Sequence, residues 1–254
     1  MSIAHLMLWM LGTGISLTYS RAKLVWFEPA RSQLDNIIDA EALATWQQAV
    51  AVVICPFAGA AVAALLATGW QLARRKPIPC SQPGHWLLLV AGVAFLNNVT
   101  DAVMRYLTLR ALLAEQDYSL LTSLRIGLLA IINLGVAALF FVAWRFTLGP
   151  KRWRFYFACG AMIYGLAAPL TLAIFAIGLT ELPTEPLMVL AAIIFLPLAI
   201  ALVISFVWSV AKDIWSKERR DLLHWIGVIV VIGTAVVTVA DRIVPIAFLR
   251  MLNK

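Results

Sequence analysis

Charge is what this sequence has least of. Only 13% of its 254 residues are charged, whereas 63% are hydrophobic. An ordinary soluble domain is about half apolar and about a quarter charged. The composition therefore excludes water as the main solvent of the chain. The apolar stretches recur along its whole length and leave no room for a separate soluble domain.

Cysteine is scarce as well. The three cysteines, Cys55, Cys80 and Cys159, are an odd number and form no C-x-x-C pair. Such spacing predicts neither a disulfide framework nor a zinc site. The sequence also lacks a glycine-rich nucleotide loop, a hydrolase elbow and a His-Glu-x-x-His pattern.

Histidine is equally rare, with His5, His85 and His224 as its only representatives. Each falls where a predicted membrane span begins, at its cytoplasmic end. An imidazole at such an end is normally solvated. Ligation of haem or a metal needs two or more of them to converge. We therefore expect no metal site and no cofactor.

The long apolar runs predict an all-α, polytopic transmembrane helix bundle of about seven spans. A hydrocarbon core of roughly 30 Å takes about 20 helical residues, and helices satisfy their own backbone groups in lipid. Residues 1–254 are expected to form a single integral membrane domain. The predicted spans are 3–20, 46–72, 86–109, 119–146, 154–179, 186–211 and 222–249.

The first of these segments has alternative interpretations. A short apolar N-terminus is also typical of a signal sequence. No Lys or Arg precedes this one and no convincing cleavage site follows it, so we interpret it as a helix. A six-span protein with this segment at the membrane interface is the alternative.

The distribution of Lys and Arg predicts the orientation. Eleven lie on the side of the N-terminus: Arg74, Arg75, Lys76, Arg145, Lys151, Arg152, Arg154, Lys212, Lys217, Arg219 and Arg220. The opposite side holds six: Arg21, Lys23, Arg31, Arg110, Arg250 and Lys254. By the positive-inside rule the N-terminus is cytoplasmic and the C-terminus is outside, in a membrane of the bacterial inner or plasma type. The net charge of +7 then reflects the orientation of the chain in the membrane. No nucleic-acid partner is expected.

One polar stripe interrupts the third span. Asn97, Asn98, Asp101 and Arg105 lie within about 100° of one another on a helix of 100° per residue. At 1.5 Å per residue, Asp101 lies roughly 22 Å from the start of the span, in the outer third of the bilayer. Charges in hydrocarbon are costly and normally face a bundle interior or a wet cavity.

Two other spans carry polar groups at a similar depth. Arg125 and Asn133 lie on the fourth span and Asp241 on the seventh. The predicted ligand-binding residues are therefore Asp101, Arg105, Arg125, Asn97, Asn98, Asn133 and Asp241. We expect Asp101 to be ionised and to pair with Arg125 or with Arg105 of its own helix.

The stripe has a structural and a functional interpretation. Asp101 and Arg105 are spaced i,i+4 and can simply neutralise each other. Alternatively, the layer is an outward-facing polar vestibule for an ion or a small polar solute, as in a transporter or ligand-sensing bundle. A third hypothesis is a non-catalytic subunit or scaffold that packs against partner membrane proteins or forms a homo-oligomer within the lipid bilayer.

An enzyme is the least favoured class. A lone carboxylate stripe supplies neither a nucleophile with its base nor a metal site. The stretch "NNVTDAVMR" resembles the Asp-rich signature of membrane prenyltransferases only in outline, because Asn98 and Arg105 occupy two of its acidic positions. We therefore assign no family and no catalytic residues.

Aromatic and small residues predict packing. Tryptophans flank the spans, as rings at the headgroup level do: Trp46, Trp70, Trp86, Trp144, Trp153, Trp208 and Trp225. The run "AGAAVAALLATG" places Gly59, Ala63 and Ala67 four apart, which is typical of a close-packing helix face.

Overall fold

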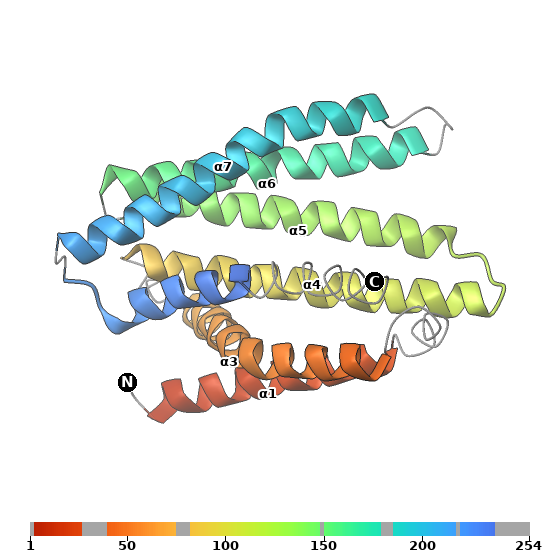
Figure 1. Cartoon of the computed structure of the whole chain (residues 1–254), viewed down its shortest axis with the longest axis horizontal. Helices are drawn as coiled ribbons and strands as arrows, with labels where there is room; N and C mark the ends of the chain where they lie inside the picture. The colour runs from red at the N-terminus through yellow and green to blue at the C-terminus, as the bar shows by residue number, and fades with distance from the viewer. Residues whose placement is uncertain are drawn as a thin grey trace, which may run out of the picture. The chain divides into compact units, whose positions relative to one another are not determined.

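The computed structural model describes residues 3–26, 40–74, 82–147, 150–178, 185–216 and 219–236, and all their regular structure is helical. The helices are α1 (Ile3–Trp26), α3 (Ala40–Ala73), α4 (Pro83–Leu113), α5 (Ser119–Phe146), α6 (Lys151–Gly178), α7 (Glu185–Trp215) and a shorter helix, Leu222–Val236. Figure 1 shows them coloured along the chain. The predicted all-α fold is confirmed.

Five of these helices are long and apolar enough to cross a membrane: Gln48–Ala73, Pro83–Leu113, Ser119–Phe146, Lys151–Ile177 and Pro186–Trp215. They match the second to sixth predicted spans, and they make this an integral membrane protein. α1 is not among the five. The predicted seventh span corresponds to the helix Leu222–Val236 and continues to 249, outside the described residues. The choice between six and seven spans therefore stays a prediction.

The chain divides into two compact units. Unit 1 comprises residues 1–78 and 226–254, and unit 2 comprises residues 79–225. The helix Leu222–Val236 begins in unit 2 and continues in unit 1.

In unit 1, α1 and α3 cross at a pair of glycines. A Cβ added at Gly12 would overlap the carbonyl oxygen of Gly59, and one added at Gly59 would overlap Thr13. Trp9 Nε1 donates to the carbonyl oxygen of Pro56 at 2.8 Å, next to the crossing. The close approach predicted for the small-residue face of the second span is thus confirmed at Gly59.

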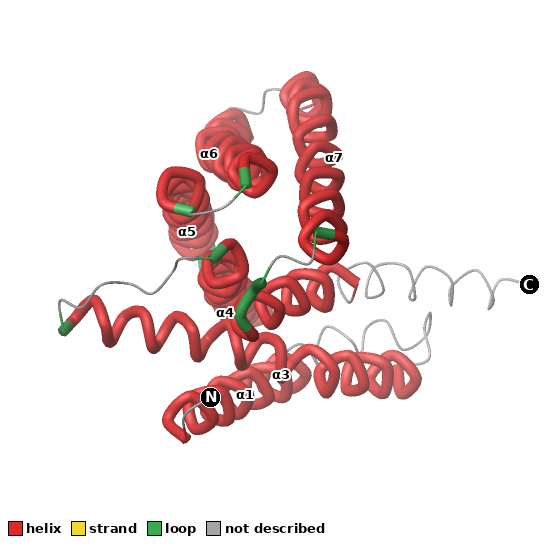
Figure 2. The backbone as a smooth tube through the Cα atoms, turned by 90° about the vertical axis from the view of Figure 1, so that its left-hand side faces the viewer, coloured by secondary structure: helices red, strands yellow, loops and turns green. Residues whose placement is uncertain are grey.

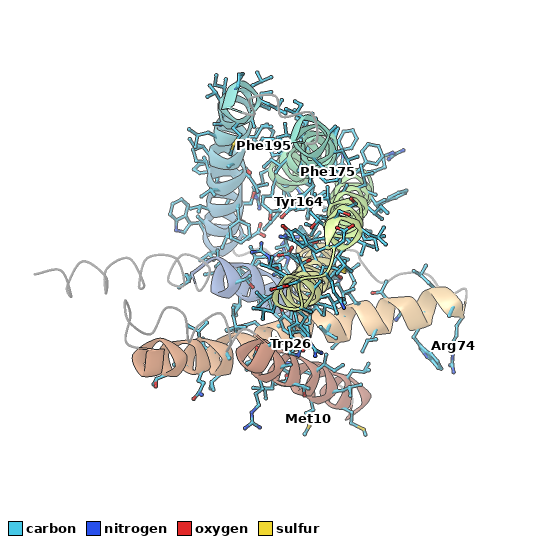
Figure 3. The ribbon with its side chains drawn as sticks, turned by 90° about the vertical axis from the view of Figure 1, so that its right-hand side faces the viewer. Met10, Trp26, Arg74, Tyr164, Phe175 and Phe195 are labelled. Atoms are coloured by element: carbon cyan, nitrogen blue, oxygen red, sulfur yellow. The ribbon has the colours of Figure 1, made fainter. Side chains whose placement is uncertain are left out.

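The end of α3 has an aromatic and basic tip. The Arg74 guanidinium carbon lies 4.3 Å from the centre of the Trp70 ring, and Arg74 is labelled in Figure 3. Trp70 is 61% exposed. This arrangement is typical of a helix end at a membrane interface.

In unit 2, α4 packs on α5, α5 on α6 and α6 on α7, so neighbours in sequence are neighbours in space. Figure 2 views α4, α5 and α6 close to end-on, while α7 runs up the picture. An aromatic core lies between α5 and α6. Phe140 stacks on Tyr164 with centroids 5.6 Å apart, and Tyr164 is labelled in Figure 3. Gly160 makes room for Phe140, because a Cβ there would overlap the Phe140 ring.

Two of the tryptophans predicted to lie at the headgroup level have rings buried within the protein. Trp153 is fully buried and Trp86 is 5% exposed. Trp153 packs edge-on against Phe206 of α7, with centroids 6.0 Å apart. Sequence position gives the height of a ring along its helix. It does not give the side of the helix that faces the core.

The connection between α4 and α5 is short and well capped. Glu115 takes a left-handed backbone conformation (φ 54°), and Gln116 N–H donates to the Ala111 carbonyl at 2.9 Å. Asp117 accepts hydrogen bonds from the backbone N–H and the hydroxyl of Ser119, at 2.9 and 3.0 Å. These two bonds lower the pKa of Asp117. The turn fixes the antiparallel pairing of α4 and α5 that builds the site described next.

Candidate functional site

The α4 stripe and α5 meet at one carboxylate. Arg105 Nε donates to Asp101 Oδ2 at 2.7 Å from one turn along α4. Arg125 Nε donates to Asp101 Oδ1 at 2.7 Å from α5. Both predicted partners therefore bind Asp101, one through each oxygen. We call these three residues the Asp101 clamp.

The clamp is partly open to its surroundings. The side chains of Asp101 and Arg125 are 23% and 28% exposed, and that of Arg105 is 57% exposed. Each arginine uses its Nε, and its terminal nitrogens make no hydrogen bond within the described part of the chain. One carboxylate and two guanidinium groups carry a formal net charge of +1. The clamp therefore has hydrogen-bond donors that are not in use and an excess of positive charge.

The other predicted residues are distributed around the clamp in different ways. Asn97 lies one turn before Asp101, half-buried, and its Oδ1 is buried with no hydrogen-bond partner in the described structure. Asn98 is exposed, and Asn133 is half-buried on α5, two turns beyond Arg125. Asp241 lies outside the described residues.

A second charged cluster, which the sequence analysis missed, lies at the opposite end of unit 2. Asp213, near the end of α7, has a fully buried side chain. Its Oδ1 accepts hydrogen bonds from Arg152, at the start of α6, and from Arg220 Nη2 at 3.2 Å. Its Oδ2 accepts one from Trp153 Nε1 at 3.0 Å. These residues, with His224, form the Asp213 cluster.

His224 is fully buried, so the prediction that all three histidines are solvated at span ends is wrong for it. Its Nδ1 accepts a hydrogen bond from the backbone N–H of Gly84 at 3.0 Å. Its Nε2 lies 3.3 Å from Asp213 Oδ2, a close electrostatic contact without hydrogen-bond alignment. A Cβ at Gly84 would overlap the His224 backbone, so only glycine permits this approach. The cluster therefore joins the start of α4 to α6 and α7.

His85 and Asp221 extend this end of the unit. His85 Nε2 lies 3.0 Å from Asp221 Oδ2, and the backbone N–H of His224 donates to Asp221 Oδ1 at 2.8 Å. Partial burial raises the pKa of Asp221. The His224 N–H and the His85 ring outweigh that effect, and the pKa lies below its usual value of 3.8.

The two clusters allow different chemistry. An adjacent Asp and His is a common acid–base pair, but the free lone pair of His224 already accepts the Gly84 N–H, so it is not available as a base. Both oxygens of Asp213 are also occupied. The Asp213 cluster therefore has the features of a structural tie. The Asp101 clamp instead presents unused guanidinium donors, which bind carboxylate or phosphate oxygens.

One sequence signal pointed to the Asp213 cluster. Asp213 directly follows Lys212 at the end of an apolar span, in a basic connection that also contains Arg219 and Arg220. A lone acid in such a basic segment favours an ion pair. Its burial depends on Arg152 and Trp153, about 60 residues earlier, and on the rotation of α6 and α7.

Comparisons with protein-family models, with curated proteins and with solved structures found no match to this chain.

Proposed function

We propose that this integral membrane protein binds a small anionic solute at the Asp101 clamp, as a transporter or ligand-sensing bundle. The observation that carries the proposal is one carboxylate held between two guanidinium groups, with a net charge of +1 and partial exposure. By the positive-inside rule the clamp faces the outside of the cell.

The role of Asp101 in this proposal is to orient the two arginines. Each of its oxygens accepts an Nε–H at 2.7 Å, which fixes the planes of both guanidinium groups. The terminal nitrogens are then available to an incoming anion, with little further loss of side-chain freedom. Partial burial strengthens the attraction, since the effective dielectric constant there is lower than in water.

The polar groups beyond the clamp support a route into the bilayer. Asn97 and Asn133 lie about 6 Å and about 12 Å farther from the α4–α5 turn than their neighbours Asp101 and Arg125. Both are near the middles of their helices. An amide side chain at that depth destabilises the folded protein unless it contacts a polar partner.

The proposal is tested by calorimetric titration of the purified protein in neutral detergent. The probes are acetate, butyrate, sulfate and inorganic phosphate, with choline as a cationic control. Arg125→Gln removes one guanidinium from the clamp and should weaken anion binding at least about 10-fold, as the loss of a charge-assisted hydrogen bond does.

Arg145→Gln is the matched control, because Arg145 is an exposed arginine at the far end of the same helix. It should leave anion affinity unchanged. Equal affinities for the two variants, or no binding of any anion, would overturn the proposal.

A second candidate function is that of a membrane subunit packed against a partner. The observation that favours it is α7, whose most apolar stretch is unburied throughout and exposes Ile193, Leu196, Ile200, Val203 and Ile204. A helix that faces lipid presents the same surface, so α7 supports this candidate less strongly than the clamp supports anion binding. Cysteine cross-linking in native membranes through Val203→Cys distinguishes them, because only a subunit gives a discrete cross-linked band.

A further inference from the structure

Asn97 carries a buried oxygen, unpaired within the part of the chain that the structure describes, one helical turn from the clamp. It lies one helical turn from Asp101, about 40° around α4, and therefore on the same face of the helix. Its Oδ1 is buried and has no hydrogen-bond partner among the described residues. A carbonyl oxygen removed from water without a donor is destabilising, so native structures rarely leave one unpaired.

The unpaired oxygen lies on one particular side of the clamp. α4 spans Pro83–Leu113, and Asn97 is near its middle, whereas Arg105 is closer to its end. In a membrane, Asn97 is therefore deeper than the two guanidinium groups, whichever way the protein is inserted. A ligand held by the arginines presents its opposite end to Asn97.

Resting on the proposed function, we propose that the solute carries a hydrogen-bond donor, a hydroxyl or an amine, at the end opposite its anionic group. The guanidinium groups of Arg105 and Arg125 bind the anion, and Asn97 Oδ1 accepts the hydrogen bond. The ligand class is that of small hydroxy- or amino-carboxylates.

The depth of Asn97 also separates a soluble solute from a lipid headgroup. A phospholipid whose phosphate sat on the arginines would direct its ester carbonyls and acyl chains toward the middle of the bilayer. Those groups offer Asn97 Oδ1 no donor. The hydroxyls and amines of common headgroups lie on the water side of the phosphate. The site therefore fits a water-soluble solute that enters with its donor end first.

The experiment compares 4-hydroxybutyrate with valerate, which has the same length and charge but a methyl group in place of the hydroxyl. Calorimetry is carried out in nanodiscs of phosphatidylcholine, which carry no net charge. Wild-type protein should bind 4-hydroxybutyrate about 10-fold more tightly than valerate, as expected for one hydrogen bond to a buried acceptor. Asn97→Leu should abolish that preference.

Two further variants keep the test decisive. Asn97→Asp retains the acceptor but adds a negative charge, and it should weaken binding of both solutes. Ser123→Val is the control for a polar-to-apolar change, because Ser123 is exposed on α5 and its hydroxyl donates to the Ser119 carbonyl. It should bind as wild type does. An unfolding scan of each variant reports whether it is folded.

Failure of this inference is distinguishable from failure of the proposed function. Equal binding of the two solutes, with Arg125→Gln still weakening both, overturns the donor requirement and leaves anion binding intact. Binding of phosphatidylglycerol in place of either solute overturns the soluble ligand. Absence of binding by every anion overturns both proposals.

Discussion

The two charged clusters of unit 2 are built from the same residue types and differ in burial and in how fully the carboxylate is engaged. Asp213 is fully buried, and both of its oxygens accept hydrogen bonds, from Arg152, Arg220 and Trp153. Asp101 is 23% exposed and has two partners, whose terminal nitrogens make no hydrogen bond in the described structure. A buried carboxylate with both oxygens engaged by neighbouring segments holds helices together. A partly exposed cluster with guanidinium donors not in use can bind a ligand.

The largest effect is expected from Asp213→Ala. It leaves the mostly buried Arg152 and Arg220 without their carboxylate, and breaking such a buried pair costs about 3–5 kcal/mol. The measurement is SDS-induced unfolding of the purified protein. Glu115→Gln, at an exposed loop position, is the control and should unfold as wild type does. A cost below about 1 kcal/mol would mean that the cluster does not tie the helices together.

Gly84→Ala should be the next most damaging. The new methyl group would overlap the His224 backbone, and overpacking of this kind costs typically 1–3 kcal/mol. Gly127→Ala is a matched control, because a Cβ at Gly127 meets nothing within 4 Å. That change should stabilise α5 by up to about 1 kcal/mol, since alanine is the better helix former. Unfolding curves that shift in the same direction for both variants would contradict the close approach at Gly84.

At the clamp, Asp101→Ala should cost more than Asp101→Asn. Alanine leaves both arginines without an acceptor, whereas asparagine keeps a carbonyl oxygen for one of them. We expect about 1–2 kcal/mol for Asp101→Ala, less than at Asp213, because solvent screens the partly exposed arginines. The same unfolding assay checks the order of the two variants. Two equally harmless substitutions would show that the clamp contributes nothing to stability.

The smallest effect concerns pH at Asp221. Its pKa is lower in the folded protein than the ordinary 3.8, so its stabilising contribution is present above about pH 4. That contribution is lost as the pH falls through the folded-state pKa. The difference in unfolding temperature between wild type and Asp221→Asn should therefore shrink between pH 6 and pH 3. A difference that is constant over this range would rule out the folded-state shift.

Much of the site could be predicted from the sequence, and the reason is its spacing. Asp101 and Arg105 are four residues apart on one helix, so their pairing is local. Arg125 was predicted because the antiparallel turn returns the chain to the same depth within about 24 residues. The Asp213 cluster had no partner at helical i,i+4 spacing. Arg220 is 7 residues away, and Arg152 and Trp153 are 61 and 60 residues away. The burial of His224 depends in addition on contact with Gly84, 140 residues away.

By itself, the sequence determined that the chain forms long apolar helices, because length and composition decide whether a segment can satisfy its backbone in lipid. It also determined the height of each polar group along its helix, since the rise per residue is constant. Only the tertiary structure decided which polar groups are buried and saturated. Burial depends on the rotation of each helix about its axis, which is set by packing against distant segments: Trp153 against Phe206, and Gly84 against His224. For that reason one aspartate is buried between helices while the other is partly exposed.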